Sequence, residues 1–272
     1  MTTRAGGRSS TSLREVFLSF DTLSRVDGSA RFGFGSVPQA LVSLSGPIEV
    51  RLAAEHPSQA TLEVHLRPIS NVPSTESKFL SSSISSALTP SLILTQNPRT
   101  LIQIVIQTLV SSPGSKWKDG LVASMINACT LALINAGSIP MRGVVCAVSL
   151  GCIRVDSTYV YVVDPTEDEA RDLVGGGCFA FLFSDFEPLS ESGATCVWSS
   201  WRRWDGFGFD EEEILKARGM AKEAAREVWR RVKRLVEETE DTRMTSAIPI
   251  PKNKAAKMKM NEGEVEDAKM EI

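Results

Sequence analysis

The sequence is poor in the residues from which metal sites and histidine relays are built. It has only two histidines, His56 and His65, and its five cysteines form no Cys-x-x-Cys pair. Zinc sites and histidine-activated nucleophiles need such residues in sets with ligand spacing. Neither histidine stands near such a set, so we predict no metal site and no cofactor. The odd number of cysteines, most of them in apolar runs, indicates buried reduced thiols in an intracellular protein.

Other absences narrow the class of protein. No apolar run of about 18 residues lacks polar interruption, so we predict no membrane span. The net charge of −3 argues against a strongly basic nucleic-acid binder but leaves room for a local basic strip. The triple glycine at 175–177 lacks the Gly-Lys-Ser or Gly-Lys-Thr ending of a P-loop. We therefore expect a flexible loop or a bulge there.

The most informative stretch follows Asp119-Gly120, which reads as a turn. Residues 121–136 have almost no polar face and are followed by Gly137 and Pro140. A helix that is apolar all round must be covered on nearly every side, so this is predicted to be a buried central helix. Its N-terminus would attract an anion through free N–H groups. However, no Arg or Lys follows Gly120, and Leu121 and Val122 stand at the helix start.

The remaining patterns predict strands and a few covering helices. The expected strands are 13–20, 29–35, 40–45, 48–51, 61–67, 101–110, 143–150, 158–163, 178–183 and 195–201, and the other helices are 75–88, capped by Ser74, and 211–238. The run at 101–110 predicts a central strand covered on both faces. Asp210 and Glu213 predict a capping box. This is an α+β single domain at 12–240, with disordered tails at 1–11 and 241–272, the second one charged.

Several short motifs together resemble the RNase PH family. They are DGSARFGFG at 27–35, SLSGPIEV at 43–50, ATLEVHLRP at 60–68, NPRTLIQIVIQ at 97–107, DGLVASMINACTLALINAGSIPMRG at 119–143 and VDPTEDEARD at 163–172. Their order and spacing make the set specific over residues 12–238. The resemblance implies an RNase PH-like fold, also called ribosomal protein S5 domain 2-like, of mixed sheets covered by helices.

The resemblance also implies what an active site would need. Active family members carry a Gly-Gly-Thr-Arg run that binds phosphate at the start of the central helix. The matching run here holds Gly120, Leu121 and Val122, without the guanidinium. Two metal-binding aspartates are matched only partially, by Asp168 and Asp172. The implied reading is a degenerate site without phosphorolysis. The alternative is a phosphate-dependent 3′-to-5′ exoribonuclease that uses both aspartates with magnesium and holds the anion with Lys116 or Lys118.

By the same resemblance, the expected partners are those of the RNA exosome. The chain would pair with other RNase PH-like subunits in a hexameric ring, beneath S1/KH cap subunits and together with a hydrolytic exoribonuclease subunit. The ring would thread RNA for 3′-to-5′ processing and decay. The implied location is the nucleus and nucleolus, and also the cytoplasm, with no membrane contact.

Two groups of residues are candidates for contact with RNA or with partners. Basic residues in loops that would face the ring channel, and contact RNA phosphates without reading sequence, are Arg67, Lys78, Lys116 and Lys118. Ordinary solvated side chains are the equal alternative. The segment from Trp198 to Trp204, with Arg202 and Arg203, suits either base stacking or a protein interface, and we favour the interface.

Overall fold

The computed structural model describes residues 4, 7–21, 23–70, 72–110, 118–155, 158–184, 193–204, 208 and 210–246. The chain divides into two units, residues 1–236 and residues 237–272. Helix α3 (Glu211–Ser246) begins in the first unit and supplies the described part of the second. The helix therefore continues beyond residue 238, its expected end, and beyond the domain boundary expected at 240. Residues 247–272 of the expected tail lie outside the described residues.

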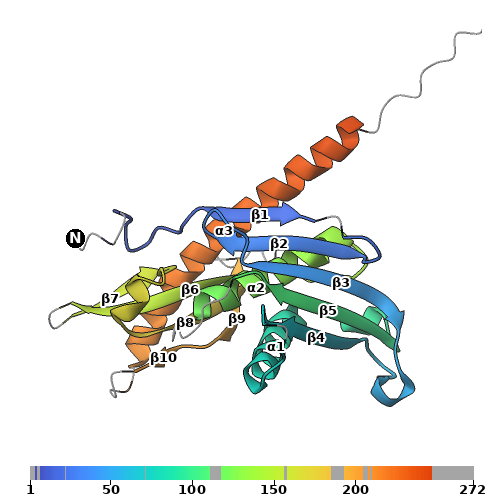
Figure 1. Cartoon of the computed structure of the whole chain (residues 1–272), viewed down its shortest axis with the longest axis horizontal. Helices are drawn as coiled ribbons and strands as arrows, with labels where there is room; N and C mark the ends of the chain where they lie inside the picture. The colour runs from blue at the N-terminus through green and yellow to red at the C-terminus, as the bar shows by residue number, and fades with distance from the viewer. Residues whose placement is uncertain are drawn as a thin grey trace, which may run out of the picture. The chain divides into compact units, whose positions relative to one another are not determined.

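The first sheet contains the strands from the N-terminal half of the chain. They are β1 (Val16–Phe20), β2 (Gly28–Phe34), β3 (Ala40–Glu49), β4 (Thr61–Arg67) and β5 (Thr100–Thr108), in the order β1-β2-β3-β5-β4 (Figure 1). β4 is parallel to β5 and lies at the edge of the sheet. The pairing of β3 with β5 shifts register between Ser45 and Ile48, and the two expected strands 40–45 and 48–51 form this one bulged strand.

β5 is central, but the prediction that both its faces are covered is wrong. Ile102, Ile104 and Ile106 are fully buried, whereas the alternate residues Gln103 and Val105 are only partly buried. A strand turns successive side chains to opposite faces. The inner face therefore packs in the core, while the outer face of the first sheet stays partly open to solvent.

The second sheet is built from the C-terminal half. Its strands are β6 (Val144–Val155), β7 (Thr158–Val163), β8 (Leu173–Phe183), β9 (Ala194–Ser199) and β10 (Arg202–Arg203), in the order β10-β8-β6-β7, with β9 also paired to β8. The triple glycine lies inside β8, so a loop is wrong, while the pairing of β8 with β6 shifts register directly before Gly175, as the alternative of a bulge predicts. A Cβ on Gly177 would lie 2.6 Å from the carbonyl oxygen of Ser200. Glycine is thus required where the segment after β9 crosses β8 closely.

Helix α2 (Asp119–Ala136) lies between the two sheets, as its sequence predicts, and contacts β2 and β3 on one side and β6 and β8 on the other. By length and composition alone it would suit a membrane span, but most of it is buried inside the protein. Helix α1 (Thr75–Leu88) packs on β4 and α2. Ser74 caps it as predicted, in a capping box with Ser77. The short 3-10 helices are η1 (Leu52–Ala54), η2 (Thr89–Ser91), η3 (Leu94–Gln96) and η4 (Glu169–Arg171).

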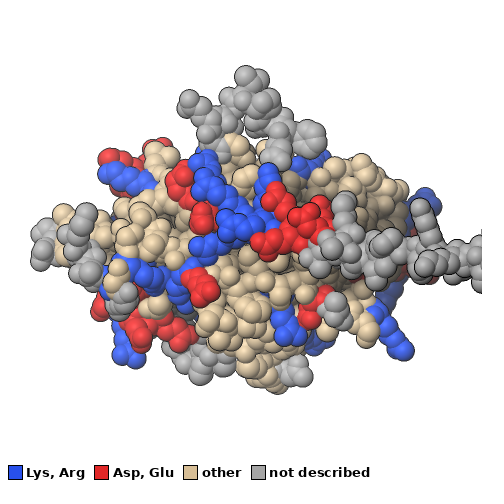
Figure 2. Space-filling model, turned by 90° about the horizontal axis from the view of Figure 1, so that it is seen from above, with Lys and Arg blue, Asp and Glu red and all other residues tan. Residues whose placement is uncertain are grey.

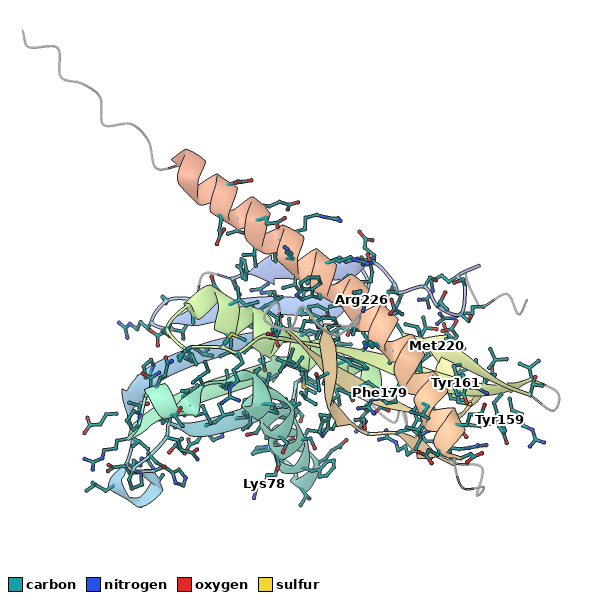
Figure 3. The ribbon with its side chains drawn as sticks, turned by 180° about the vertical axis from the view of Figure 1, so that it is seen from behind. Lys78, Tyr159, Tyr161, Phe179, Met220 and Arg226 are labelled. Atoms are coloured by element: carbon teal, nitrogen blue, oxygen red, sulfur yellow. The ribbon has the colours of Figure 1, made fainter. Side chains whose placement is uncertain are left out.

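Helix α3 packs on the second sheet through a row of small and apolar residues. Ala217, Ala221 and Val228 are buried, and Trp229 stacks on Phe183 with 5.6 Å between ring centroids. Figure 3 shows Met220 and Arg226 on α3 and Tyr161 and Phe179 on the adjoining sheet. The arrangement confirms the α+β class, with two sheets, a helix between them and helices covering them.

The predicted capping box at the start of α3 is wrong. The carboxylate of Glu213 accepts a hydrogen bond from Arg203 at 2.8 Å instead of turning back to Asp210. The carboxylate of Asp210 accepts a hydrogen bond from the adjacent N–H of Glu211, at 2.8 Å. Glu213 is nearly buried, and a buried carboxylate is stabilised more by a guanidinium than by a single amide.

Candidate functional site

The start of α2 is the place where the family resemblance puts a phosphate. Lys118 precedes the helix and makes no side-chain cap. Asp119, only 2% exposed, is the first helical residue, so the turn expected at Asp119-Gly120 is wrong and both residues belong to α2. Its carboxylate accepts hydrogen bonds from Arg202 Nη2 at 2.7 Å and from Ser200 Oγ at 3.2 Å. Burial raises the pKa of Asp119, and the opposing effects of Arg202 and Ser200 do not cancel it.

The residues of the degenerate run point into the protein rather than toward a ligand. Gly120 and Val122 are buried, and Leu121 packs partly buried against the core. Ser124, one turn later, donates to the carbonyl of Gly120 at 2.9 Å. The whole of α2 contains no Lys or Arg. The helix therefore carries no cation of its own.

Arg202 reaches Asp119 because the segment that carries it is anchored in the second sheet. Arg202 and Arg203 pair with Gly176 and Gly175 of β8. Trp201 packs against Phe179, with 5.7 Å between ring centroids. This ion pair was not predicted from the sequence. The unusual Trp-Arg-Arg-Trp composition was its only signal.

Part of the predicted partner-binding segment, Trp198 to Trp204, packs against other residues of this chain. Trp201 also lies 6.2 Å from Tyr161, and Arg203 stacks on Tyr159 at 4.2 Å. Trp204 differs, since it is 44% exposed and lies 5.8 Å from the guanidinium of Arg202. Edge packing within the chain thus accounts for Trp201 and Arg203, and Trp204 keeps a solvent-exposed ring.

The predicted metal-binding aspartates flank the short helix η4. Asp168 precedes it, Asp172 follows it, and both are exposed. Neither side chain makes a described hydrogen bond or ion pair with the residues at the start of α2. In the part of the chain that the structure describes, no three His, Cys, Asp or Glu side chains gather into a group suited to a metal ion.

The carboxylates that the structure does organise in this region are Asp164 and Glu169. Asp164 is fully buried, has a left-handed backbone with φ of 48°, and is bound by Arg14 through Nη2 at 2.6 Å and Nε at 2.7 Å. Glu169 is bound by Arg4 through Nη2 at 2.7 Å and Nε at 2.9 Å. Burial alone raises the pKa of Glu169, but hydrogen bonds from Arg4 and Thr166 bring it below its ordinary value.

Part of the expected N-terminal disordered tail is therefore ordered against this cluster. Arg4 is only 9% exposed, and it also donates to the carbonyl oxygens of Val163 at 2.9 Å and Asp164 at 3.1 Å. Arg8 lies 3.5 Å from Glu169. The polar, small composition of residues 1–11 hides these contacts, because the partners are some 160 residues away in the sequence.

Of the four predicted RNA-contacting residues, Arg67 ends β4 and Lys78 lies in α1, so the expectation of loops is wrong for these two. Lys116 lies outside the described residues. Lys118 forms an ion pair of 2.5 Å with Glu76 at the start of α1. Arg67 and Lys78 are both exposed and line one groove of about 660 Å³ between β4 and α1.

Comparison with known proteins agrees with this architecture. The profile of the RNase PH family, described as 3′ exoribonuclease family, domain 1, matches residues 12–138. The chain is 37% identical over 127 residues to the "Exosome complex component rrp46" of Schizosaccharomyces pombe, covering 47% of this chain and 53% of that protein. It is 30% identical over 170 residues to the "Exosome complex exonuclease RRP46 homolog" of Oryza sativa, covering 62% of this chain and 67% of that protein.

The chain thus spans about half to two thirds of the length of these two curated relatives. The crystal structure of rice Rrp46 superposes with a TM-score of 0.68 at 23% identity, over 85% of this chain and 98% of that chain. This superposition establishes the shared fold. The chain belongs to the RNase PH family.

Proposed function

We propose that this protein is a ring subunit of the RNA exosome that does not catalyse phosphorolysis. Its fission yeast relative is named as an exosome complex component and its rice relative as an exosome complex exonuclease, and its fold superposes on rice Rrp46. In this role it pairs with other RNase PH-like subunits and helps to build the channel through which RNA is threaded. S1/KH cap subunits and a hydrolytic exoribonuclease subunit complete the assembly, in the nucleus and nucleolus and in the cytoplasm.

The observation that carries the non-catalytic part is the absence of a cation from α2. Phosphorolysis requires the enzyme to hold an inorganic phosphate dianion and to stabilise the charge that develops at the scissile phosphate. No residue from Asp119 to Ala136 is basic, and Arg202, which the structure places at this helix end, is paired with Asp119. Losing a guanidinium clamp of this kind costs several kcal/mol of transition-state stabilisation, or roughly a thousandfold in rate.

A phosphorolysis assay tests this part. The full chain, alone and co-expressed with its RNase PH-like partners, is incubated with end-labelled single-stranded RNA, magnesium and inorganic phosphate. We expect no release of nucleoside diphosphates, while an active family member tested in parallel releases them. Release that disappears in Asp168→Ala or Asp172→Ala would instead establish the phosphate-dependent exoribonuclease.

Co-purification tests the ring assignment separately. The tagged full chain is expected to recover other RNase PH-like chains at near-stoichiometric ratio after washing in moderate salt. Recovery of the tagged chain alone, as a monomer or as a homodimer, contradicts membership in a mixed ring.

A further inference from the structure

We propose that the free edge of strand β9 binds an extended, acidic segment of a partner protein, which adds to the second sheet as a further strand. The backbone of the segment pairs with Ala194 and Cys196, and its carboxylates lie against Arg218 and Lys222 of helix α3. The inference goes beyond the proposed function, because it assigns a surface and the chemistry of its partner whether or not the chain lies in a ring.

Strand β9 lies at an edge of the second sheet. Within the described part of the chain it pairs only with β8, in antiparallel register. The N–H of Ser184 donates to the carbonyl of Gly193 at 3.4 Å, so Gly193 turns its carbonyl toward β8. Since successive residues of a strand turn their backbone polar groups to opposite edges, the N–H and C=O groups of Ala194 and Cys196 point away from β8. The first half of β9 therefore offers donors and acceptors to another strand.

A pocket lies on each face of the sheet beside this free edge. The first, called here the α3 pocket, has a volume of about 370 Å³ and is lined by Phe181, Cys196, Leu215, Arg218, Gly219 and Lys222. The second, the Met141 pocket, has a volume of about 510 Å³ and is lined by Ile93, Met141, Arg142, Leu182 and Thr195.

The two pockets suit the alternating side chains of an added strand. Phe181 and Leu182 are successive residues of β8, so the α3 pocket and the Met141 pocket open on opposite faces of the sheet. Helix α1 also contacts β9, but no residue of α1 lines either pocket. A peptide that pairs with a sheet edge gains affinity from its backbone and specificity from pockets for its alternate side chains.

The charges at the two pockets favour carboxylates. Arg142 and Arg218 are exposed and Lys222 is partly buried. None of the three forms an ion pair with another described residue, and no described Asp or Glu lines either pocket. Arg218 and Lys222 are four residues apart on α3, where like charges repel each other. A carboxylate placed between them removes that repulsion.

The following turns of α3 are different, because their cations are neutralised within the helix. Arg226 pairs with Glu223 at 2.9 Å. Arg231 pairs with Glu227 at 3.3 Å. On the face of the molecule seen in Figure 2, basic and acidic side chains likewise lie side by side. At the α3 pocket, the same helix carries two cations for which the described part of the chain supplies no carboxylate.

Gly219 leaves room for the bound segment. It lies inside α3 and lines the α3 pocket, and a Cβ added to it would meet no atom within 4 Å. Glycine inside a helix is less favourable than alanine, and no close neighbour in the described chain requires it here. Its missing side chain keeps the pocket open beside Cys196 and Leu215.

Apolar surface determines the rest of the pattern that the partner must have. Leu215, in the α3 pocket, is 58% exposed. Ile93, Met141 and Leu182 are partly buried and line the Met141 pocket. Aliphatic side chains of a bound strand would remove this surface from water. The fitting segment therefore has acidic residues at alternate positions and aliphatic residues between them.

A peptide matches this edge better than a nucleic acid does. Phosphate oxygens only accept hydrogen bonds, so they leave the outward carbonyl groups of Ala194 and Cys196 without donors. An extended peptide supplies both N–H and C=O groups at the spacing of a strand.

Binding of a model peptide tests the proposal. The probe is a fluorescein-labelled peptide of about six residues, the length of a typical strand, in which Glu alternates with Val. Its anisotropy is followed during titration with the full chain, and we expect saturable binding that weakens as salt is raised. A peptide with Gln in place of Glu is expected to bind roughly tenfold more weakly. A peptide methylated at its backbone nitrogens is expected not to bind, because it cannot pair with β9.

A variant that fills the α3 pocket locates the site. Gly219→Leu places a side chain where the chain itself leaves open space, so we expect it to abolish binding while the fold, checked by urea unfolding, is retained. Gly219→Ala is the matched control. It adds one methyl group, and we expect it to raise the free energy of unfolding and to leave peptide affinity unchanged within about twofold.

A second pair of variants tests the role of charge. Arg218→Gln/Lys222→Gln is expected to weaken binding of the Glu-Val peptide roughly tenfold and to reduce its salt dependence. Lys216→Gln/Arg230→Gln removes the same charge from positions on α3 whose side chains already pair with glutamates. We expect this control to bind like the wild type.

Several outcomes contradict the proposal. They are no saturable binding of the Glu-Val peptide, equal binding by the wild type and Gly219→Leu, and equal binding of the methylated peptide. Oligo(U) RNA that displaces the peptide and loses its own binding in Gly219→Leu would make the edge a nucleic-acid site instead. Peptide binding that disappears when the chain is assembled with RNase PH-like partners would mean that a neighbouring subunit, rather than an acidic segment, covers β9.

Discussion

At two sites in this protein, the pKa of a buried carboxyl group is shifted in opposite directions. At the start of α2, Asp119 is paired with Arg202 alone, and burial raises its pKa. In the cluster next to η4, Arg4, Arg8 and Arg14 surround Asp164 and Glu169, and the pKa of Glu169 is lowered. Asp119 and Glu169 are both buried, so burial acts in the same direction on the pKa of each carboxyl group.

The difference lies in the number of charge-assisted hydrogen bonds. Burial disfavours a charged carboxylate, and direct donors reverse that preference only when there are enough of them. Glu169 accepts two hydrogen bonds from Arg4 and one from the N–H of Thr166. The cluster near η4 therefore contributes to stability in its charged form. At the start of α2, Arg202 and Ser200 offset only part of the cost of burying the Asp119 charge.

The largest expected effect on the free energy of unfolding comes from removing the charge of Asp164, in the cluster next to η4. Asp164→Asn keeps a residue that accepts the left-handed backbone but removes the charge that Arg14 binds. We expect the free energy of unfolding of the full chain to fall by about 3 kcal/mol, the lower end for a broken buried ion pair. Urea unfolding followed by tryptophan fluorescence measures it. A loss as small as that of Glu223→Gln, an exposed pair on α3 expected to cost less than about 0.5 kcal/mol, contradicts the central role of the cluster.

A smaller effect is expected at the start of α2. Arg202→Gln removes the cation from Asp119 but leaves an amide that can still donate a hydrogen bond. The expected loss is about 1 kcal/mol, because Arg202 itself is partly exposed and its pairing is weakened by solvent. The same urea unfolding experiment measures it. A loss equal to that of Asp164→Asn would show that the ion pairs of the two sites contribute equally to stability.

The smallest effects, but the most direct comparison, lie in the pH dependence. The folded pKa of Glu169 lies below its ordinary value of 4.5, so its contribution is complete above pH 4.5 and is lost as the pH falls through the folded pKa. The folded pKa of Asp119 lies above its ordinary value of 3.8, so protonation favours the folded state at low pH, and this benefit is lost as the pH rises through the folded pKa.

The two matched variants therefore give opposite trends. Unfolding free energies are measured from about pH 3 to pH 7 for the wild type, Glu169→Gln and Asp119→Asn. The advantage of the wild type over Glu169→Gln should shrink on acidification, and its advantage over Asp119→Asn should grow. Parallel trends would mean that Asp119 is charged as readily as Glu169.

Local patterns in the sequence predicted the elements well wherever one segment determines its own environment. The apolar circumference of α2, the strand at 61–67 and the cap at Ser74 are all confirmed. Predictions failed where a distant segment supplies the partner. Glu213 binds Arg203 instead of its own helix end, and Arg4 binds a carboxylate 165 residues away.

The features of the candidate site also divide into those visible in the sequence and those set by the fold. The absence of Lys and Arg from α2 is visible in the sequence and needs no coordinates. By contrast, the basic residues expected to contact RNA could be sorted only by the fold, because Lys118 pairs with Glu76 of α1, whereas Arg67 and Lys78 line one groove. A charge is available to a ligand only if no neighbour neutralises it, and the neighbours are set by topology.

The sequence by itself thus determined the family, the elements and a helix start that carries no positive charge, because periodicity and composition act within short stretches of chain. Only the tertiary structure decided which charges are neutralised. Ion pairs join residues that the sheets bring together across the length of the chain, and the energy of each pair depends on burial and distance, which no single stretch of sequence contains.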